Sequence, residues 1–376
     1  MRKVHITLVG KQKEPVLNVI DYTKPDLVYL IHSKDSVGNS NAIQREIGIK
    51  CILKELDPSD LTSIYLKINE LKRELDAEDD ISLNLTSGTK HWALAFYESF
   101  RVLRNAKIFL VDQNHIISDF ATLSVDNVDF DMDQVFRLNG NPLNYYTSLS
   151  EYSDADFDVM HGVEEARRYN FREFLALAAN LSEADQKKVQ LQNSGLLESA
   201  NHNRVVWSDQ QVVLSLCNNR LGWSDFEFDS PFAKKIVFNS GWFELKVADI
   251  LSHCNLLSDI RLNCTFPQLL GPEGKIKNEV DIIAKLNNRI LFVECKTKLF
   301  NSTDIDKFRT VVSNYGGNAS KALFITEAAM DNYQKEKCKE SNITTFALND
   351  YRGKSELEME QDLFSLIEQI SVTINY

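Results

Sequence analysis

The sequence predicts an α/β protein with two sheets joined by a mainly helical segment, and three observations lead to this fold class. In the amino-terminal part, short apolar runs alternate with stretches of helical periodicity, the order that gives a parallel sheet with helices on both faces. In the middle of the chain, apolar residues recur at helical spacing. In the last third, a helical stretch is followed by two apolar strands that carry acidic residues.

The amino-terminal sheet is expected to use four apolar strands, near residues 4–9, 27–31, 81–85 and 107–111. Ligands bind sheets of this kind beyond the carboxyl ends of the strands. Gly10, Ser33 and residues 86–90 directly follow strands, so we expect them to lie at that edge.

The segment Thr86-Ser-Gly-Thr-Lys90 is suited to binding phosphate. Gly88 lets the backbone approach a ligand closely, the loop opens a helix whose free N–H groups attract anions, and Lys90 adds positive charge. The sequence contains neither the Walker pattern nor the dinucleotide-binding glycine pattern. A tight strand-to-helix turn capped by a hydroxyl group is an equal alternative for this segment.

The carboxyl-terminal part is expected to contain a β-hairpin with strands near 280–283 and 290–293. Because side chains alternate along a strand, Glu294 and Lys296 point to the same face of the sheet. Asp281 lies on the neighbouring strand, so two carboxylates and a lysine converge at one end of the hairpin.

This combination of side chains is what metal-dependent phosphodiester hydrolysis needs. Carboxylate oxygens hold a hard divalent ion, the ion activates a water molecule, and a lysine stabilises charge in the transition state. The alternative is a surface hairpin in which Glu294 and Lys296 form an ordinary ion pair.

Two further side chains, Glu244 and Lys307, each have two possible roles. Glu244 is expected in the first turn of a helix, where it adds a third carboxylate to the site or complements the helix dipole. Lys307 is expected on a helix at 304–312, where it reaches the phosphate or is solvated.

The amino-terminal loops resemble those of the CRISPR-associated Rossmann-fold (CARF) domains. Asn84-Leu-Thr-Ser-Gly-Thr-Lys90 resembles the N-x-T-G-G-T-K loop of that family, with Ser87 in place of the first glycine. Leu8-Val-Gly-Lys-Gln-Lys-Glu-Pro15 resembles its first loop. The resemblance implies a Rossmann-like CARF domain at the amino terminus.

The carboxyl-terminal pattern resembles the PD-(D/E)xK nucleases, with Asp281, Glu294 and Lys296 as the motif and Val280 in place of the proline. Gly241-Trp-Phe-Glu244 is similar to the start of their nuclease domain in the CARF-nuclease effectors of type III CRISPR systems. The two halves together resemble these effectors, and the resemblance implies a restriction-endonuclease-like domain at the carboxyl terminus.

The resemblance implies a function and a set of site residues. A cyclic oligoadenylate would bind across a homodimer of CARF domains and activate a DNA- or RNA-cleaving nuclease of antiviral defence that uses Mg²⁺ or Mn²⁺. Twofold symmetry favours an even-membered ring, with cyclic tetra-adenylate preferred. The implied ligand-binding residues are Gly10, Gln12, Ser33, Thr86, Gly88, Thr89 and Lys90. The implied metal ligands are Glu244, Asp281 and Glu294, and Lys296 completes the catalytic set.

Two other functions stay open from the sequence. In one, the chain is a CARF regulator with an inactive nuclease-like domain. In the other, the CARF domain is a ring nuclease that degrades its own cyclic oligoadenylate.

The expected domains are a CARF domain at 1–150, a mainly helical linker region at 151–232 and the nuclease domain at 233–376. Helices are expected at 163–179 and again at 210–216 within the linker. Arg167, Arg168 and Arg172 would form one basic face of the first helix, either solvated or in contact with nucleic acid.

Composition limits the possible partners. The net charge of −12 excludes a generally basic nucleic-acid binder, so any polynucleotide contact is local. The six cysteines contain no C-x-x-C pair and are expected to be reduced thiols of a cytoplasmic protein. Apolar runs are too short for a membrane span.

Overall fold

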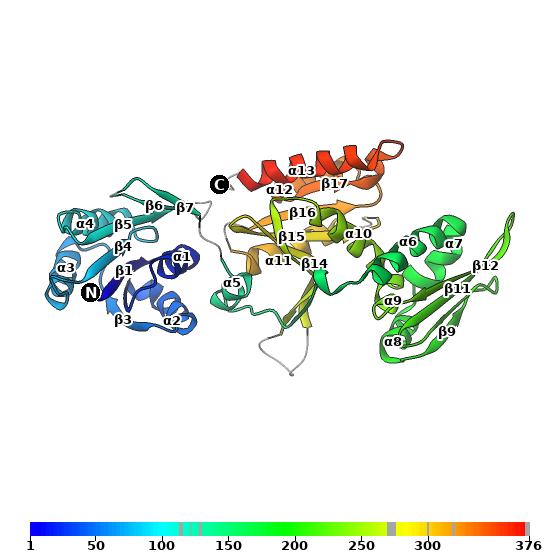
Figure 1. Cartoon of the computed structure of the whole chain (residues 1–376), viewed down its shortest axis with the longest axis horizontal. Coiled ribbons are helices and arrows are strands. Elements are labelled where there is room, and N and C mark those ends of the chain that lie inside the picture. Colours follow the sequence, from blue (N-terminus) through cyan, green and yellow to red (C-terminus); the bar gives the residue numbers. More distant parts are fainter. Residues whose placement is uncertain are drawn as a thin grey trace.

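The computed structural model of the chain describes residues 1–112, 116–120, 122–127, 130–268, 276–298, 301–317 and 320–372. Three sheets follow one another along the long axis of the molecule (Figure 1): a seven-stranded sheet at the amino-terminal end, a six-stranded sheet in the centre and a four-stranded sheet at the far end. No helix among the described residues has the length and apolarity needed to cross a membrane. The six cysteines all lie in the described ranges and are free thiols.

The amino-terminal sheet has the order β3-β2-β1-β4-β5-β6-β7. Its first five strands are parallel, and the last two are added antiparallel. The strands are β1 (Lys3–Val9), β2 (Leu27–His32), β3 (Lys50–Glu55), β4 (Asp80–Asn84), β5 (Ala106–Val111), β6 (Ile116–Asp119) and β7 (Val125–Asn127). The four predicted strands are confirmed. The sequence reading missed the half-buried edge strand β3, which lacks a long apolar run.

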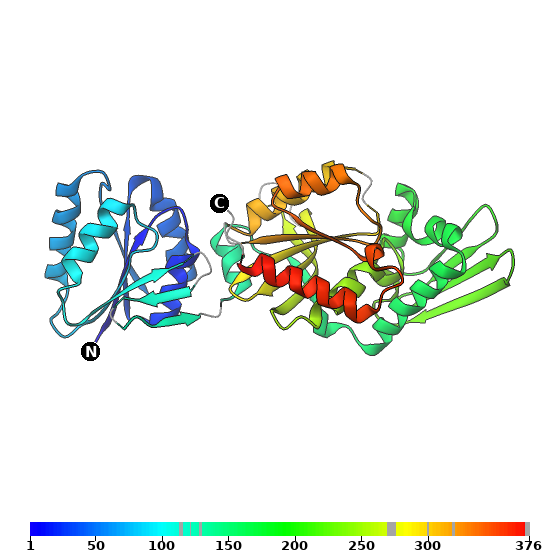
Figure 2. The ribbon, with the colours of Figure 1, turned by 90° about the horizontal axis from the view of Figure 1, so that it is seen from above.

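Helices cover both faces of this sheet (Figure 2). They are α1 (Glu14–Thr23), α2 (Val37–Glu46), α3 (Leu61–Glu74) and α4 (Lys90–Phe100). Helices α1 and α2 bury apolar side chains in one core cluster, and α3 and α4 bury theirs in another. This doubly covered parallel sheet leaves its carboxyl edge to the loops.

The central sheet has the order β17-β16-β15-β14-β13-β8. The pairs β8–β13, β13–β14 and β14–β15 are antiparallel, and the pairs β15–β16 and β16–β17 are parallel. The strands are β8 (Tyr145–Ser148), β13 (Leu257–Pro267), β14 (Ile276–Leu286), β15 (Arg289–Lys296), β16 (Lys321–Thr326) and β17 (Thr344–Ala347). The predicted hairpin is confirmed as β14 and β15, and Asn287 at its turn has a left-handed φ of 50°.

Two core clusters lie on the faces of the central sheet. One is formed with α10 (Gly241–Ser252) and α13 (Glu356–Val372). The other is formed with α11 (Thr303–Tyr315) and α12 (Asn332–Glu340). Cys295 belongs to the first cluster and Phe292 to the second, so the odd- and even-numbered residues of β15 face opposite layers.

Helix α5 (Met132–Leu138) connects the first sheet to the second. Its residues Met132, Val135 and Phe136 are part of the central core, whereas Leu138 is part of the amino-terminal core. After it, β8 pairs with β13 in the central sheet. The expected boundary at residue 150 therefore lies beyond a strand that already belongs to the next sheet.

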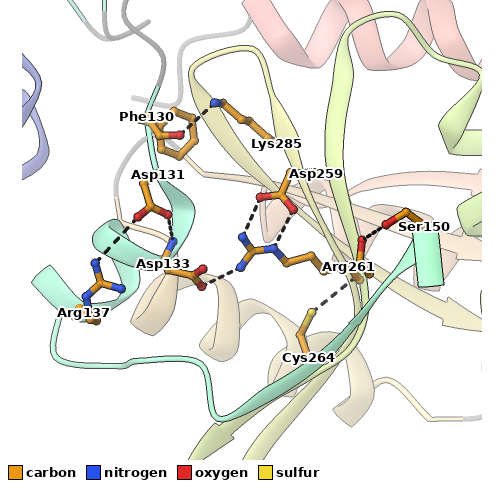
Figure 3. A network of polar contacts seen from close by, with 10 residues as sticks. Phe130, Asp131, Asp133, Arg137, Ser150, Asp259, Arg261, Cys264 and Lys285 are labelled. Atoms are coloured by element: carbon orange, nitrogen blue, oxygen red, sulfur yellow. Dashed lines mark hydrogen bonds and ion pairs between the residues drawn. The ribbon is translucent and has the colours of Figure 1, made fainter.

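A polar network fixes α5 to the central sheet (Figure 3). The buried Arg261 guanidinium on β13 donates to Asp133 of α5 at 2.7 Å and to Asp259 at 2.7 and 2.9 Å. Lys285 donates to the Phe130 carbonyl oxygen at 2.9 Å.

The segment expected to be mainly helical is helical only in its first half. It contains α6 (Asp154–Tyr169), α7 (Phe171–Phe174), a π-helical turn (Leu175–Ala179) and α8 (Glu183–Leu191). A four-stranded antiparallel sheet follows, formed by β9 (Gly195–Glu198), β10 (Arg204–Trp207), β11 (Gln211–Asn218) and β12 (Gly222–Asp229).

The helix prediction for 210–216 is therefore wrong, because these residues form most of β11. A short apolar run has the same appearance in a buried strand and in a buried helix, and the β-branched Val212 and Val213 favour the strand. The side chains of this segment share one core cluster with α10 and α13, so it packs as part of the central body.

Candidate active site and ligand loops

Three of the predicted nuclease residues lie together at the end of the β14–β15 hairpin. The Lys296 Nζ is 2.7 Å from Glu294 Oε1 and 3.6 Å from Asp281 Oδ2. Asp281 also accepts a hydrogen bond of 2.7 Å from the Cys295 backbone N–H, which fixes its carboxylate across the two strands. The side chains of Asp281 and Glu294 are only 15% and 16% exposed, so their charges interact under weak solvent screening.

The electrostatics of this cluster follow from burial and from like charges. Burial and repulsion by Asp281 raise the pKa of Glu294 to about 7. Burial opposes the charge of Lys296, but the carboxylates of Asp281 and Glu294 outweigh it and raise its pKa above the ordinary value. The site therefore holds excess negative charge that a cation would stabilise.

Glu244 lies in the first turn of α10, as expected. Burial raises the pKa of its carboxyl group well above the ordinary value, and repulsion by the Asp281 carboxylate adds to this rise. Gly241 allows the helix to begin here, because an added Cβ would lie 2.1 Å from the Lys235 carbonyl oxygen of α9 (Ala233–Val237).

The carboxylates of the site offer oxygen donors of the kind that bind a divalent cation. Within the described ranges, no three Asp, Glu, His or Cys side chains are close enough together to hold a metal ion by themselves. Lys296 lies between two of the carboxylates instead. The oxygen donors nevertheless fit a hard ion such as Mg²⁺, which keeps several waters and uses one or two protein carboxylates.

Thr326 is a neighbour of the site that sequence reasoning missed. It pairs with Lys296 across β15 and β16, it is fully buried, and its hydroxyl oxygen has no hydrogen-bond partner. No sequence motif marks it, because its position depends on the strand register. Lys307 is exposed on α11, so both readings of this residue stay open.

The predicted ligand residues lie on three adjacent loops of the amino-terminal sheet. Gly10 follows β1, Ser33 follows β2 and Thr86 follows β4, and β1 lies between the other two strands. The first and third loops touch, because a Cβ on Gly10 would lie 2.0 Å from the Ser87 carbonyl oxygen. The Ser87 hydroxyl donates to the Gln12 carbonyl oxygen at 3.0 Å. Glycine at position 10 is thus required by the close approach of two backbones.

Some hydroxyl groups of these loops already form hydrogen bonds within the protein. Thr86 Oγ1 donates to Asn84 Oδ1 at 2.7 Å and accepts from the Val111 N–H at 2.8 Å, so it braces the loop. Ser33 interacts with Ser36 in its own turn.

Thr89 and Lys90 are exposed at the start of α4, and the Thr89 hydroxyl does not cap that helix. The helix N-terminus, Thr89 and Lys90 are therefore the groups best placed to meet an anion, and the backbones of Gly10 and Gly88 shape the surface beside them. Asn39, which sequence reasoning missed, donates to the Gly10 carbonyl oxygen at 2.8 Å and holds the first loop.

Two sequence-family models match the chain in the same order as the two sites. The Card1 CARF domain matches residues 4–139, and the Card1-like endonuclease domain matches residues 233–342. No curated protein sequence matches the chain significantly.

Solved structures share the fold over nearly the whole chain. Can2 from Sulfobacillus thermosulfidooxidans, in complex with cyclic tetra-adenylate, has a TM-score of 0.64 at 15% identity and covers 99% of this chain and 100% of its own. Protein VC1899 from Vibrio cholerae has a TM-score of 0.66 at 15% identity over 98% of each chain. A type III CRISPR defence DNA nuclease activated by cyclic oligoadenylate has a TM-score of 0.54 at 14% identity, and the match covers 93% of this chain and 51% of that one.

The fold and the two family matches define a ligand-sensing domain joined to a nuclease domain. The two family matches together span most of the chain, and they identify the sensor as a CARF domain and the nuclease as a Card1-like endonuclease. The chain is a CARF domain joined to an endonuclease domain, which is the architecture of a cyclic oligoadenylate-activated nuclease of CRISPR defence.

Proposed function

We propose that the enzyme cleaves phosphodiester bonds at Asp281, Glu294 and Lys296, with Glu244 as the third carboxylate and Mg²⁺ or Mn²⁺ as the ion. The observation that supports this most directly is the placement of Lys296, whose ammonium lies within 3.6 Å of one carboxylate and 2.7 Å of the other. A divalent ion bound by the carboxylates would neutralise phosphate charge and activate water.

The protein groups around that ion have distinct tasks. Asp281 is held by the Cys295 N–H, so its second oxygen can face an ion without reorientation. Lys296 stays protonated and gives a fixed positive charge where the pentavalent phosphate gains negative charge. The carboxylates of Asp281 and Glu294 are largely shielded from bulk water, which strengthens their interactions with a cation and with Lys296.

Cyclic tetra-adenylate is the proposed activator. The structure of Can2 with this ring and the same fold supports the choice. One chain offers one anion-binding loop, at Thr86, Gly88, Thr89 and Lys90, next to Gly10, Gln12 and Ser33. Two chains related by a twofold axis would present two such loops to opposite sides of the ring, so we propose a homodimer.

DNA is the favoured substrate, with RNA as the second possibility. A related fold belongs to a DNA nuclease, and attack on phosphorus does not require a 2′-hydroxyl group. Because the net charge is −12, we expect weak, salt-sensitive nucleic-acid binding confined to the region of the site.

One assay tests the whole proposal. Plasmid DNA, single-stranded DNA and RNA are incubated with the enzyme and Mn²⁺ or Mg²⁺, with and without cyclic tetra- and hexa-adenylate, and the fate of the ring is followed. We expect ring-dependent cleavage of DNA and an intact ring. A ring that is consumed without polynucleotide cleavage would instead identify a ring nuclease, and binding with neither reaction would identify a regulator.

A further inference from the structure

Arg167 of α6 lies outside the nuclease motif, and its charged side chain is held by several contacts to residues next to the nuclease site. Its guanidinium forms two parallel hydrogen bonds with Glu327, Nη1 to Oε1 at 2.9 Å and Nη2 to Oε2 at 2.8 Å. The guanidinium carbon lies 4.1 Å from the ring centroid of Trp242 and 5.5 Å from that of Phe171. The side chain is only 10% exposed.

This geometry corrects the sequence prediction of one basic face made of Arg167, Arg168 and Arg172. Arg168 and Arg172 are exposed, whereas Arg167 points inward and is neutralised by Glu327. A planar guanidinium that is stacked on an aromatic ring and paired with both oxygens of a carboxylate has a single preferred orientation.

Trp242 and Glu327, the two partners of Arg167, are close neighbours of the proposed catalytic residues Glu244 and Lys296. Trp242 is buried in the first turn of α10, two residues before Glu244. Glu327 directly follows β16, and its backbone N–H donates to the Lys296 carbonyl oxygen at 3.0 Å. Arg167 therefore joins the helix that carries Glu244 to the strand end that carries Lys296.

A second contact between α6 and α10 does not make this connection. Lys246 of α10 donates to Glu164 of α6 at 2.6 Å, and both residues line a cavity of about 260 Å³ together with Trp242 and Glu327. This pair holds the two helices together, and among the described residues neither side chain forms a hydrogen bond or ion pair with β15 or with the end of β16. It is thus a matched control for the role of Arg167.

We propose that Arg167 is a positioning residue of the nuclease: it fixes the Glu244 carboxylate relative to Lys296. The inference rests on the proposed function, and it assigns a task to the segment between the two matched domains. Metal-binding carboxylates depend on outer partners for their orientation, and loss of such a partner commonly lowers activity or metal affinity 10- to 100-fold.

The test compares Arg167→Lys, Arg167→Met and Glu327→Gln with the controls Glu164→Gln and Arg168→Met, all in the full chain with activating ring. We expect kcat to fall about 10-fold in Arg167→Lys and up to about 100-fold in Arg167→Met, while KM for DNA and affinity for the ring are unchanged. The controls should keep wild-type kcat. Arg167→Lys retains the charge and the stem, so it remains informative if Arg167→Met fails to fold.

A second measurement is independent of cleavage. Hydrogen exchange of the amides at 241–246 in metal-free, ring-free protein should be faster in Arg167→Lys than in Arg168→Met. Wild-type kcat and unchanged exchange in Arg167→Lys would overturn the proposal, as would a loss of kcat of equal size in Glu164→Gln. If wild-type protein cleaves nothing, the proposed function fails, and the exchange measurement still decides whether Arg167 holds α10.

Discussion

The sensor loops and the nuclease site both lie at strand ends, but they are constructed differently. In the CARF domain, backbone contacts such as that between Gly10 and Ser87 shape the site, and the side chains of Thr89 and Lys90 are exposed. In the nuclease domain, the half-buried side chains of Asp281, Glu294 and Lys296 interact strongly with one another. Substitutions in the first site should change affinity by modest amounts, and substitutions in the second should change rate by large ones.

The largest expected effect is in the nuclease site. Lys296→Ala should lower kcat for DNA about 1,000-fold, because it removes a fixed charge from the transition state. Ring binding by calorimetry should be unchanged, since the sensor loops lie in another sheet. Lost ring binding in a folded Lys296→Ala protein would contradict the separation of the two sites.

Removal of metal gives an effect of similar size without mutation. Excess EDTA should abolish cleavage, and Mn²⁺ should restore it at least as well as Mg²⁺, because Mg²⁺ is stricter about coordination geometry. Rates measured during titration with each metal check this. Full activity in excess EDTA would rule out the metal mechanism.

A smaller effect is expected where the two regions meet. Lys13, in the first sensor loop, donates from Nζ to the Leu138 carbonyl oxygen of α5 at 2.8 Å. Lys13→Met should reduce ring-dependent activation about 10-fold, a typical size for coupling between two sites. Ring affinity should change less than activation. The effect is measured as the ratio of the cleavage rate at saturating ring to the rate without ring. The control is Lys11→Met, which changes an exposed lysine of the same loop.

The sensor loop itself should respond modestly. Lys90→Ala should weaken ring binding about 10-fold, because it removes one exposed charge from an anion site.

Titration of the wild-type protein with the ring should give one ring bound per two chains. A ratio of one ring per chain, with a monomer by light scattering, would contradict the proposed dimer.

The last prediction concerns the stability of the sensor sheet and not its binding or activity. His5 is fully buried on β1, its Nδ1 lies 2.7 Å from Ser82 Oγ, and burial lowers its pKa from 6.5 to about 3. The unfolded chain binds a proton below pH 6.5 and the folded chain does not, so the free energy of unfolding falls as pH decreases from 6.5 toward 3.

The expected slope is about 1.4 kcal/mol per pH unit. His5→Asn should show a correspondingly shallower slope in denaturant titrations between pH 7 and 5. Equal slopes in the two proteins would show that His5 is not the group responsible.

Local patterns in the sequence predicted much of this molecule. Glu294, Cys295 and Lys296 alternate along one apolar strand, and Gly10 and Gly88 mark turns at strand ends, so their placement follows from backbone geometry alone. The pair formed by Arg167 and Glu327 spans 160 positions and has no local pattern. The same is true of Thr326, whose neighbourhood depends on how β16 aligns with β15.

The sheet of β9 to β12 shows a second reason for a wrong prediction. The run at 210–216 is too short to separate a helical from a strand period, and only pairing with β10 and β12 decides its conformation. Tertiary contacts outweigh local preference at such positions.

Helix α5 has a consequence for how such an enzyme can be divided or recombined. Its seven residues contribute to two hydrophobic interiors, so no cut between the sensor and the nuclease leaves both intact. A nuclease fragment without Met132, Val135 and Phe136 would have a cavity in its hydrophobic core where these side chains pack. If evolution replaced the sensor domain by another, the new domain would have to keep this short helix and provide apolar side chains that pack around Leu138. We therefore expect the two halves to unfold together in calorimetry, as one cooperative unit rather than as two independent modules.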